Sequence, residues 1–134
     1  MYELRTLINQ QLPICHPQLP DIHGVSHVAV YTDEPVMRHV VVGPDGRCDR
    51  SPCGNGTCAR AALLHAQGRL QTGDAFEQQS VIGSAFTCKC AEAVTVGNTP
   101  AIIPEISGQA WITAFSTYVM DETDPFKNGF SLTL

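Results

Sequence analysis

The sequence has few of the features that mark membrane, exported or nucleic-acid-binding proteins. None of its apolar runs approaches the roughly 20 residues that a membrane-spanning helix needs. Basic residues number 8 against 13 acidic ones and form no cluster along the chain, which argues against nucleic-acid binding. The N-terminal residues also lack the charged and apolar regions of a secretory signal. We therefore expect a cytoplasmic protein that binds neither membranes nor nucleic acid.

Six cysteines are present without the context of a disulfide framework or the spacing of a zinc site. A chain of 134 residues is long enough for one domain with its own core, so it does not need disulfides for stability. The intervals in Cys48-x4-Cys53-x4-Cys58 and in Cys88-x-Cys90 differ from the usual C-x-x-C of zinc ligands. We expect no metal site, and we interpret most of these cysteines as small buried hydrophobic residues.

Against this background one stretch, Asp49–Arg60, has a distinctive composition. A proline and two glycines surround Cys53, and good helix formers follow. Gly54 and Gly56 permit a tight turn, and a helix beginning near Thr57 leaves its first N–H groups unpaired at its positive dipole end. Such donors form an anion site without any basic side chain. Cys53 lies at the edge of this site, where a positive potential favours the thiolate, so we predict a reactive cysteine there.

The helix that follows is predicted to be buried. Alanine and leucine cover most of its circumference, while Thr57, Arg60 and Gln67 keep to one narrow face. A helix that is apolar nearly all round is normally buried, and Gly68 suits the position just after its end. Burial would hold the N-terminus of this helix rigidly, as an anion site requires.

The remaining patterns predict an α+β fold in one domain. Helical spacing covers 3–11, an extended loop follows over 13–24, and strand patterns occupy 26–31, 38–42, 75–82, 85–96, 101–106 and 109–120. Glycine-containing turns separate the later strands at near-regular intervals, which is typical of an antiparallel meander. We therefore expect a curved, mostly antiparallel sheet that closes around the central helix.

Two other interpretations of the key stretch were weighed. Gly54-x-Gly56-x-x-Ala59 matches a dinucleotide-binding fingerprint, with Asp74 near the position of a ribose-binding acid. The context disagrees, because residues 47–52 are polar and end in proline instead of forming a buried strand. The histidines are scattered and are interpreted as structural, although the sequence leaves a Cys–His nucleophile pair open.

The run Asp49–Thr57 resembles the second catalytic motif of the proline racemase and 4-hydroxyproline epimerase family. Further segments resemble family landmarks in the same order: His16-Pro17, 40–42, 80–86, 104–108, 110–113 and 124–126. The resemblance covers the whole chain, 1–134, as a single domain, but only the C-terminal half of a two-domain family. The Met-x-Cys-Gly-His motif of the first domain is absent. The implied fold is one half of the proline racemase and diaminopimelate epimerase-like fold, a barrel-like sheet around a central helix.

The resemblance also implies a reaction and roles for the residues of the motif. Family enzymes move the Cα proton of proline or 4-hydroxyproline between two cysteines without a cofactor, and Cys53 corresponds to one of the two. Asp49 would contact the substrate amine, and the carboxylate would be surrounded by Gly54, Asn55, Gly56, Thr57 and Cys58. A related dehydratase branch has threonine at the position of Cys53, so the cysteine favours the racemase or epimerase branch. Asn55 and Cys58 depart from the usual threonine and serine.

One cysteine cannot serve both faces of a Cα centre, and three hypotheses follow. The chain is an isomerase completed by a second half, which is either a second copy with two Cys53 side chains face to face or a separate N-terminal half. Alternatively it is a non-catalytic module that binds a small amino or imino acid, or a structural relic. Because an isolated half exposes the face that its partner domain would cover, we predict a homodimer.

Overall fold

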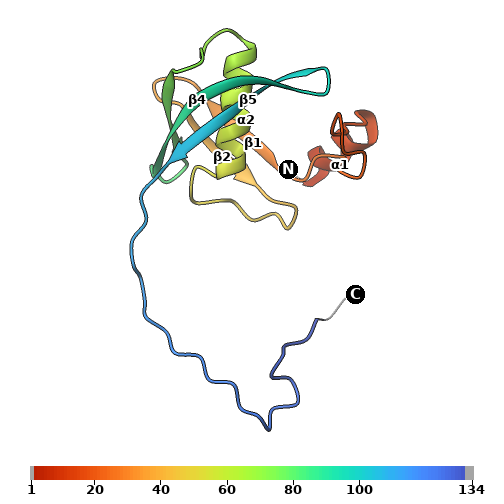
Figure 1. Cartoon of the computed structure of the whole chain (residues 1–134), viewed down its shortest axis with the longest axis vertical. Helices are drawn as coiled ribbons and strands as arrows, with labels where there is room; N and C mark the ends of the chain where they lie inside the picture. The colour runs from red at the N-terminus through yellow and green to blue at the C-terminus, as the bar shows by residue number, and fades with distance from the viewer. Residues whose placement is uncertain (1, 132–134) are drawn as a thin grey trace.

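The computed structural model describes residues 2–131 and contains two helices and five strands (Figure 1). The helices are α1, Tyr2–Gln11, and α2, Gly54–Ala66. The strands are β1 (Val28–Thr32), β2 (Arg38–Val42), β3 (Ala75–Ser80), β4 (Ala85–Val96) and β5 (Thr99–Ser107). The predicted α+β class is confirmed, and the bounds predicted for β2 and β4 agree with those observed.

The five strands form one sheet in the order β1-β2-β3-β4-β5. Three of the four pairings are antiparallel, but β2 and β3 are parallel because the chain crosses between them through α2. The sheet is therefore mixed, with one parallel pairing that the predicted antiparallel meander did not include. Among the described strands β1 and β5 each have one neighbour, so barrel-like closure of the sheet stays a prediction.

Helix α2 packs on the inner face of β4 and β5, and the core lies between them. Its members are small or branched side chains: Ala61, Leu64, Leu70, Cys88 and Cys90, with Met37, Phe76, Ile102 and Ile106 packed against them. Only Cys88 and Cys90 of the six cysteines are buried, so the interpretation of most of them as buried hydrophobic residues was wrong. Cys15 and Cys48 are exposed, Cys53 and Cys58 are half-buried, and none of the six forms a disulfide. The helix ends as predicted, with Gly68 after the C-cap at a φ of 72°.

Two predictions about α2 were wrong: the residue at which it begins and the extent of its burial. The helix begins at Gly54 instead of Thr57, and its apolar residues do not lie on a fully covered surface. The polar residues Thr57 and Arg60 are buried because each finds an acceptor inside the fold, as described below. The outward face is apolar and exposed: Ala59, Ala62, Leu63 and Ala66.

The strand predicted over 109–120 was also wrong. This segment is extended, but it is not assigned to any strand and leads away from the body as a long arm (Figure 1). The arm departs where Gly108 crosses the ring of Phe86, and a Cβ on Gly108 would lie 2.6 Å from two atoms of that ring. Because a strand needs hydrogen bonds from a neighbour, the alternating sequence alone does not make one.

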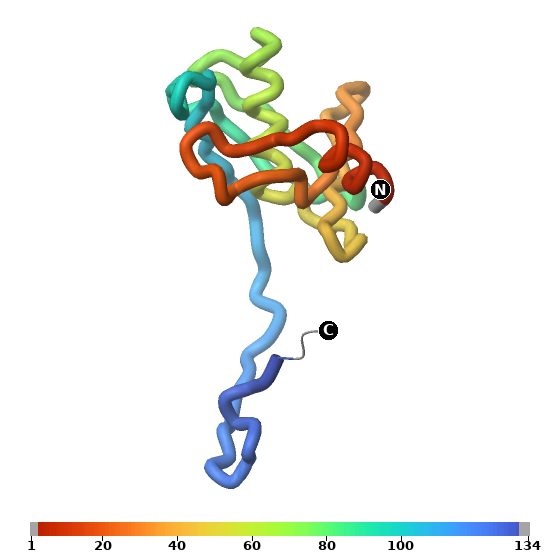
Figure 2. The backbone as a smooth tube through the Cα atoms, turned by 90° about the vertical axis from the view of Figure 1, so that its right-hand side faces the viewer, coloured from red at the N-terminus to blue at the C-terminus, as the bar shows by residue number. Residues whose placement is uncertain are grey.

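The N-terminal segment lies across the body, as Figure 2 shows. The side chain of Asn9 on α1 holds the backbone of Val25, accepting from its N–H at 2.6 Å and donating to its carbonyl at 3.0 Å. This anchor fixes the loop that leads into β1. No helix among the described residues is long and apolar enough to cross a bilayer.

Candidate active site

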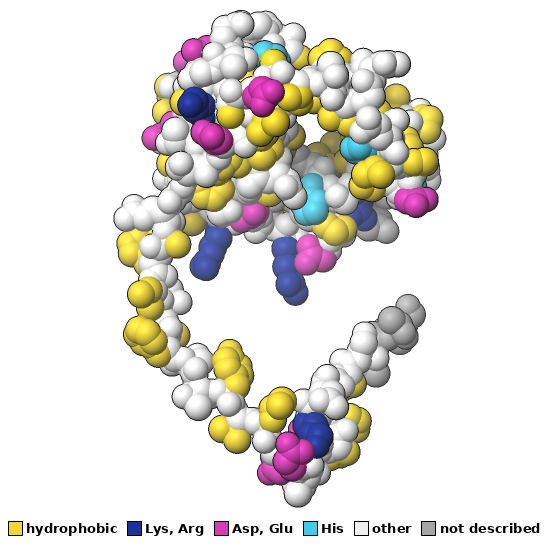
Figure 3. All heavy atoms as spheres, in the orientation of Figure 1, with side chains coloured by type: hydrophobic (Ala, Val, Ile, Leu, Met, Phe, Trp, Pro, Cys, Tyr) yellow, Lys and Arg dark blue, Asp and Glu magenta, His cyan; other side chains and the backbone are white. Residues whose placement is uncertain are grey.

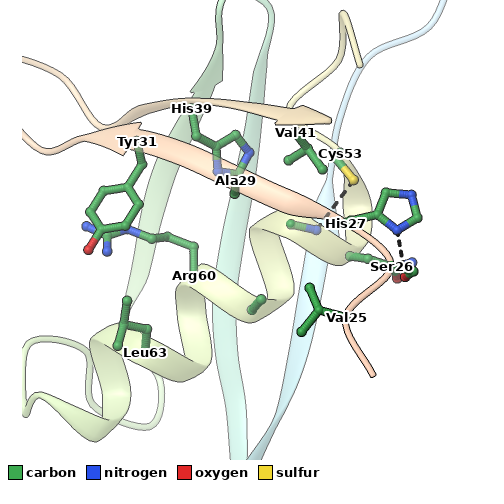
Figure 4. A pocket seen from close by; sticks show the side chains of 13 residues that line it. Val25, Ser26, His27, Ala29, Tyr31, His39, Val41, Cys53, Arg60 and Leu63 are labelled. Carbon is green, nitrogen blue, oxygen red and sulfur yellow. Dashed lines mark hydrogen bonds between the residues drawn. The ribbon is translucent and has the colours of Figure 1, made fainter. Parts of the chain in front are cut away.

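Cys53 is the N-cap of α2 and has a strained backbone. Its φ is 57°, a region that residues other than glycine rarely adopt. The sulfur takes the place of the usual capping oxygen and accepts a hydrogen bond from the N–H of Gly56 at 3.5 Å (Figure 4). Strain of this kind costs about 1–3 kcal/mol, so the surrounding contacts must hold the turn in place.

Asp49 and Ser51 hold the turn from its N-terminal side. One carboxylate oxygen of Asp49 accepts from the N–H of Ser51 at 2.9 Å and from its hydroxyl at 2.8 Å. The hydroxyl oxygen of Ser51 in turn accepts from the N–H of Cys53 at 3.0 Å. A chain of hydrogen bonds thus links the predicted amine-binding acid to the predicted nucleophile.

The carbonyl of Pro52 holds the turn from the inside. It accepts from the hydroxyl of Thr57 at 3.0 Å and from Nε2 of His39, which is buried on β2. The N–H of Thr57 donates to the carbonyl of Cys53 at 2.9 Å. Two buried side chains therefore converge on the residue before Cys53, and they fix the direction in which the sulfur points.

Two cavities meet at Cys53. The larger, about 440 Å³, lies between α2 and the strands β1 and β2 and is called the α2–β1 cavity. Its walls are mostly apolar, and Cys53 lies at one end and Tyr31 at the other (Figure 4). The lining residues include Val25, Ala29, Val41, Asn55, Gly56, Ala59 and Leu63. The smaller, about 420 Å³, is lined by both Asp49 and Cys53, so these two predicted site residues face the same space.

The far end of the α2–β1 cavity is formed by an ion cluster. The guanidinium of Arg60 pairs with Asp33 and lies 3.9 Å from the ring centre of Tyr31. Arg69 also pairs with Asp33, at 2.8 Å, and its hydrogen bond is the largest cause that holds the pKa of Asp33 below its usual value. The cluster gives Nη2 of Arg60 a partner, whereas Nε and Nη1 are buried without a hydrogen-bond partner among the described residues.

Two site residues have shifted pKa values. Partial burial works to raise the pKa of Asp49, but hydrogen bonds from Ser51 and the nearby Cys53 thiol outweigh it, so the pKa lies below its usual value. Burial, followed by the neighbouring Cys53, raises the pKa of the Cys58 thiol. Asp49 is therefore a carboxylate at neutral pH, whereas Cys58 is a neutral thiol.

The donors of the first turn are not all free. Thr57 uses both its hydroxyl and its N–H inside the turn, and the N–H of Gly56 donates to the sulfur. Among the described residues, the N–H groups of Gly54 and Asn55 make no hydrogen bond, and both residues are exposed. Cys58 is half-buried and lines neither cavity.

Sequence reasoning missed His39 and Ser51. The histidine was interpreted as one of a scattered set, yet it is buried and lies on the same face of β2 as Val41. Its period-two relation to a core valine was the available signal. It bonds to the carbonyl of Pro52, so its observed contact is with the turn and not with the sulfur. No group of metal-ligating side chains occurs within residues 2–131.

Comparison with known proteins gives matches over almost the whole chain. The family model described as proline racemase matches residues 1–131. The proline racemase of Clostridioides difficile is 42% identical over 135 residues, which cover 97% of this chain and 40% of that protein. The 4-hydroxyproline epimerase of Brucella ovis is 42% identical over 134 residues, with 96% and 40% covered. The chain thus spans about 40% of the length of these relatives.

Solved structures agree with the sequence matches. A hydroxyproline epimerase from Agrobacterium vitis, with bound trans-4-hydroxy-L-proline, matches with a TM-score of 0.80 and 39% identity over 97% of this chain and 38% of that one. A probable proline racemase from Agrobacterium radiobacter K84, with bound carbonate, matches with a TM-score of 0.76 and 40% identity, over 96% and 38%.

Proposed function

The chain belongs to the proline racemase family, and we propose that it is the Cys53-bearing half of a cofactor-independent amino-acid racemase or epimerase for proline or 4-hydroxyproline. The observation that supports this most is the position of Cys53. Its sulfur caps α2 beside free backbone donors and shares a cavity with the carboxylate of Asp49. An amino-acid racemase needs a base for the Cα proton, an anion site for the substrate carboxylate and an acidic side chain for the substrate ammonium group.

In this proposal the substrate carboxylate lies at the first turn of α2. The free N–H groups of Gly54 and Asn55 would donate to it, and the dipole of α2 would favour its charge. Gly56 and Thr57 would contribute indirectly, because their donors hold the sulfur and the turn. Cys58 lines neither cavity, so this neutral thiol would not contact the carboxylate as the sequence predicted. Asp49, ionised at neutral pH, would accept from the substrate ammonium group.

The reaction requires removal of the Cα proton and return of a proton to the opposite face. The Cys53 thiolate would take the proton and become a thiol, leaving a carbanion whose charge spreads onto the carboxylate. Donors at the first turn stabilise that developing charge. A second acid on the other face then delivers a proton. Cys48 lines the smaller cavity together with Asp49 and Cys53, and we assign the acid for the opposite face of the substrate to a second copy or to a separate N-terminal half.

Ligand binding tests the half-site separately from turnover. Pyrrole-2-carboxylate is planar at Cα, like the carbanion, so it should bind more tightly than proline. We expect calorimetry to detect binding. Asp49→Asn keeps an oxygen that can accept from Ser51, so it should leave pyrrole-2-carboxylate binding largely intact, because this ring N–H is neutral, and it should weaken proline binding. A folded protein that binds neither compound at millimolar concentration would favour the relic hypothesis.

Proton exchange then distinguishes an enzyme from a binding module. In D₂O, a lone Cys53 should exchange the Cα hydrogen of one enantiomer with retention, whereas a completed site should also invert the centre. NMR and chiral chromatography separate the two outcomes. Cys53→Ser should abolish exchange, and Cys58→Ser is the matched control that should keep it. Binding without any exchange would identify a binding module.

A further inference from the structure

The far end of the α2–β1 cavity holds a buried side chain with unused hydrogen-bond donors. Arg60 is 4% exposed and lines this cavity. Its Nη2 donates to Asp33, but Nε and Nη1 are buried and find no acceptor among residues 2–131. Buried donors in folded proteins are almost always hydrogen-bonded, to the protein itself, to ordered water or to an ion. Two unused donors on one guanidinium therefore indicate that a further group binds there.

The ion cluster around Arg60 also carries one positive charge in excess. The guanidinium groups of Arg60 and Arg69 share the single carboxylate of Asp33. Neither aspartate nor glutamate is among the described residues that line the cavity. On the face of the molecule that Figure 3 shows, the Lys and Arg side chains lie apart from one another, so this excess charge is not part of a wider basic patch there. A single carboxylate matches the cluster better than a polyanion does.

The rest of the cavity is apolar and has room for a small molecule. Its volume is about 440 Å³, and its walls include Ala29 on β1, Val41 on β2 and Leu63 on α2 (Figure 4). Small-molecule sites are usually concave and mostly apolar, with a few polar groups that fix the orientation of the ligand. The cavity thus suits an apolar body, and its Arg60 end suits a carboxylate.

The ring of Tyr31 is the movable part of the Arg60 end. Its centre lies 3.9 Å from Cζ of Arg60, so the ring covers one face of the guanidinium (Figure 4). Tyr31 is 45% exposed, whereas the guanidinium is held in place by Asp33. Exposed side chains change rotamer within nanoseconds. The ring can therefore turn toward solvent and uncover the guanidinium while Arg60 keeps its position.

The Arg60 end is separate from the place proposed for the substrate. Arg60 lies seven residues after Cys53 in the sequence, so the two are roughly 10 Å apart along the axis of α2. The proposed substrate is held at the first turn of α2 and by Asp49, which lines the smaller cavity. A molecule of the size of proline does not reach from there to Arg60. A ligand at the Arg60 end is thus independent of the chemistry proposed for Cys53.

We propose that the Arg60 end of the α2–β1 cavity binds the carboxylate of a small organic acid, and that the apolar body of this acid fills the cavity. With the Tyr31 ring turned outward, the carboxylate accepts hydrogen bonds from the guanidinium and balances the excess charge of the cluster. The apolar body packs against Ala29, Val41 and Leu63 and leaves water. A carboxylate without an apolar body, or an apolar body without a carboxylate, satisfies only half of this site.

Benzoate is the probe, and benzamide and acetate are its matched controls. Arginine Nε–H groups give separate signals in ¹H–¹⁵N NMR spectra, and the Arg60 signal is identified by its absence in Arg60→Lys. Millimolar benzoate should shift this signal, and the two controls should shift it much less, because each lacks one half of the ligand. A benzoate shift confined to the amides of Gly54 and Asn55 would overturn the proposal, because benzoate would then bind at the first turn of α2. An equal shift with either control, or no shift of the Arg60 signal, would also overturn it.

Two variants test the cavity and the guanidinium separately. Ala59 is exposed and lines the cavity, so Ala59→Phe should fill the space and abolish benzoate binding in calorimetry. Ala62→Phe is the control, because Ala62 is exposed on the same helix outside the cavity lining, and it should bind benzoate like the parent. Arg60→Lys keeps the charge but has fewer donors, and it should weaken binding by about tenfold or more. Undiminished binding by Ala59→Phe or by Arg60→Lys would refute the proposal.

Discussion

Replacing Gly56 by alanine tests how tightly the Cys53 turn is packed. A Cβ at this position would lie 2.6 Å from Cγ2 of Val41 and 3.4 Å from both Cβ of Cys53 and Cε1 of His39. Val41 is only 3% exposed and is held in β2, so the valine cannot simply rotate away into solvent. Alanine at 56 must therefore push α2, β2 or the turn.

The size of the effect follows from two opposing contributions. Overpacking of a buried site costs about 1–3 kcal/mol. Replacing glycine by alanine within a helix returns about 0.5–1 kcal/mol. We expect Gly56→Ala to lower the free energy of unfolding by about 0.5–2 kcal/mol. It should also weaken ligand binding, because the Gly56 N–H that donates to the Cys53 sulfur moves with the residue. Gly54→Ala is the matched control in the same turn, since a Cβ there meets nothing within 4 Å.

Urea and thermal unfolding of the two variants provide the measurement. Gly54→Ala should be as stable as the parent or slightly more stable, and Gly56→Ala should melt about 2–8 °C below it. Val41→Ala with Gly56→Ala removes the clashing methyl, so the double variant should be more stable than the sum of the single losses. Equal stability of Gly54→Ala and Gly56→Ala would show that the packing argument is incorrect.

Three further predictions concern the same region. Thr57→Val should lower the free energy of unfolding by about 1–2 kcal/mol, because a buried hydroxyl donor to Pro52 is lost; Thr87→Val, at an exposed position on β4, should change it little. The pKa of Asp49 is lowered on folding, so its contribution to stability is present above about pH 4 and is lost as pH falls through the folded value; Asp49→Asn should flatten this acid limb in pH-dependent unfolding. Burial, and then Cys58 and Cys90, raises the pKa of Cys88 to about 11, so timed alkylation at pH 8 with mass spectrometry should label Cys53 before Cys58, Cys88 and Cys90.

Local patterns predicted the elements of this fold well. The bounds of β2 and β4 follow from β-branched alternation between glycine-containing turns, and Gly68 ends α2 where a left-handed residue is needed. These signals lie within a few residues of the structure that they specify. The turn at Cys53 was predictable for the same reason, because proline, glycine and a helix start are adjacent in sequence.

Features that depend on distant partners were not predictable in this way. Arg60 is buried beside Asp33, which lies 27 residues earlier and pairs with it. The side of α2 that carries polar residues in the sequence therefore points into the fold. His39 is part of the Cys53 turn through a carbonyl 13 residues later. The arm failed as a strand for the converse reason: its sequence specifies strand-forming ability, but the strand itself requires a neighbour that residues 2–131 do not supply to it.

The contacts of Cys53 indicate which part of the site is already built. Each hydrogen bond that orients the turn comes from the same chain: Ser51 and Asp49 on one side, His39 and Thr57 on the other. A second half would therefore not have to order this turn, and the energy of its association would not be spent on doing so. Because the strained conformation is held without a partner, carboxylate binding should be measurable in the chain alone, while inversion should appear only once a second acid is present. If the turn instead required a partner to form, binding and inversion would appear together on addition of the second half.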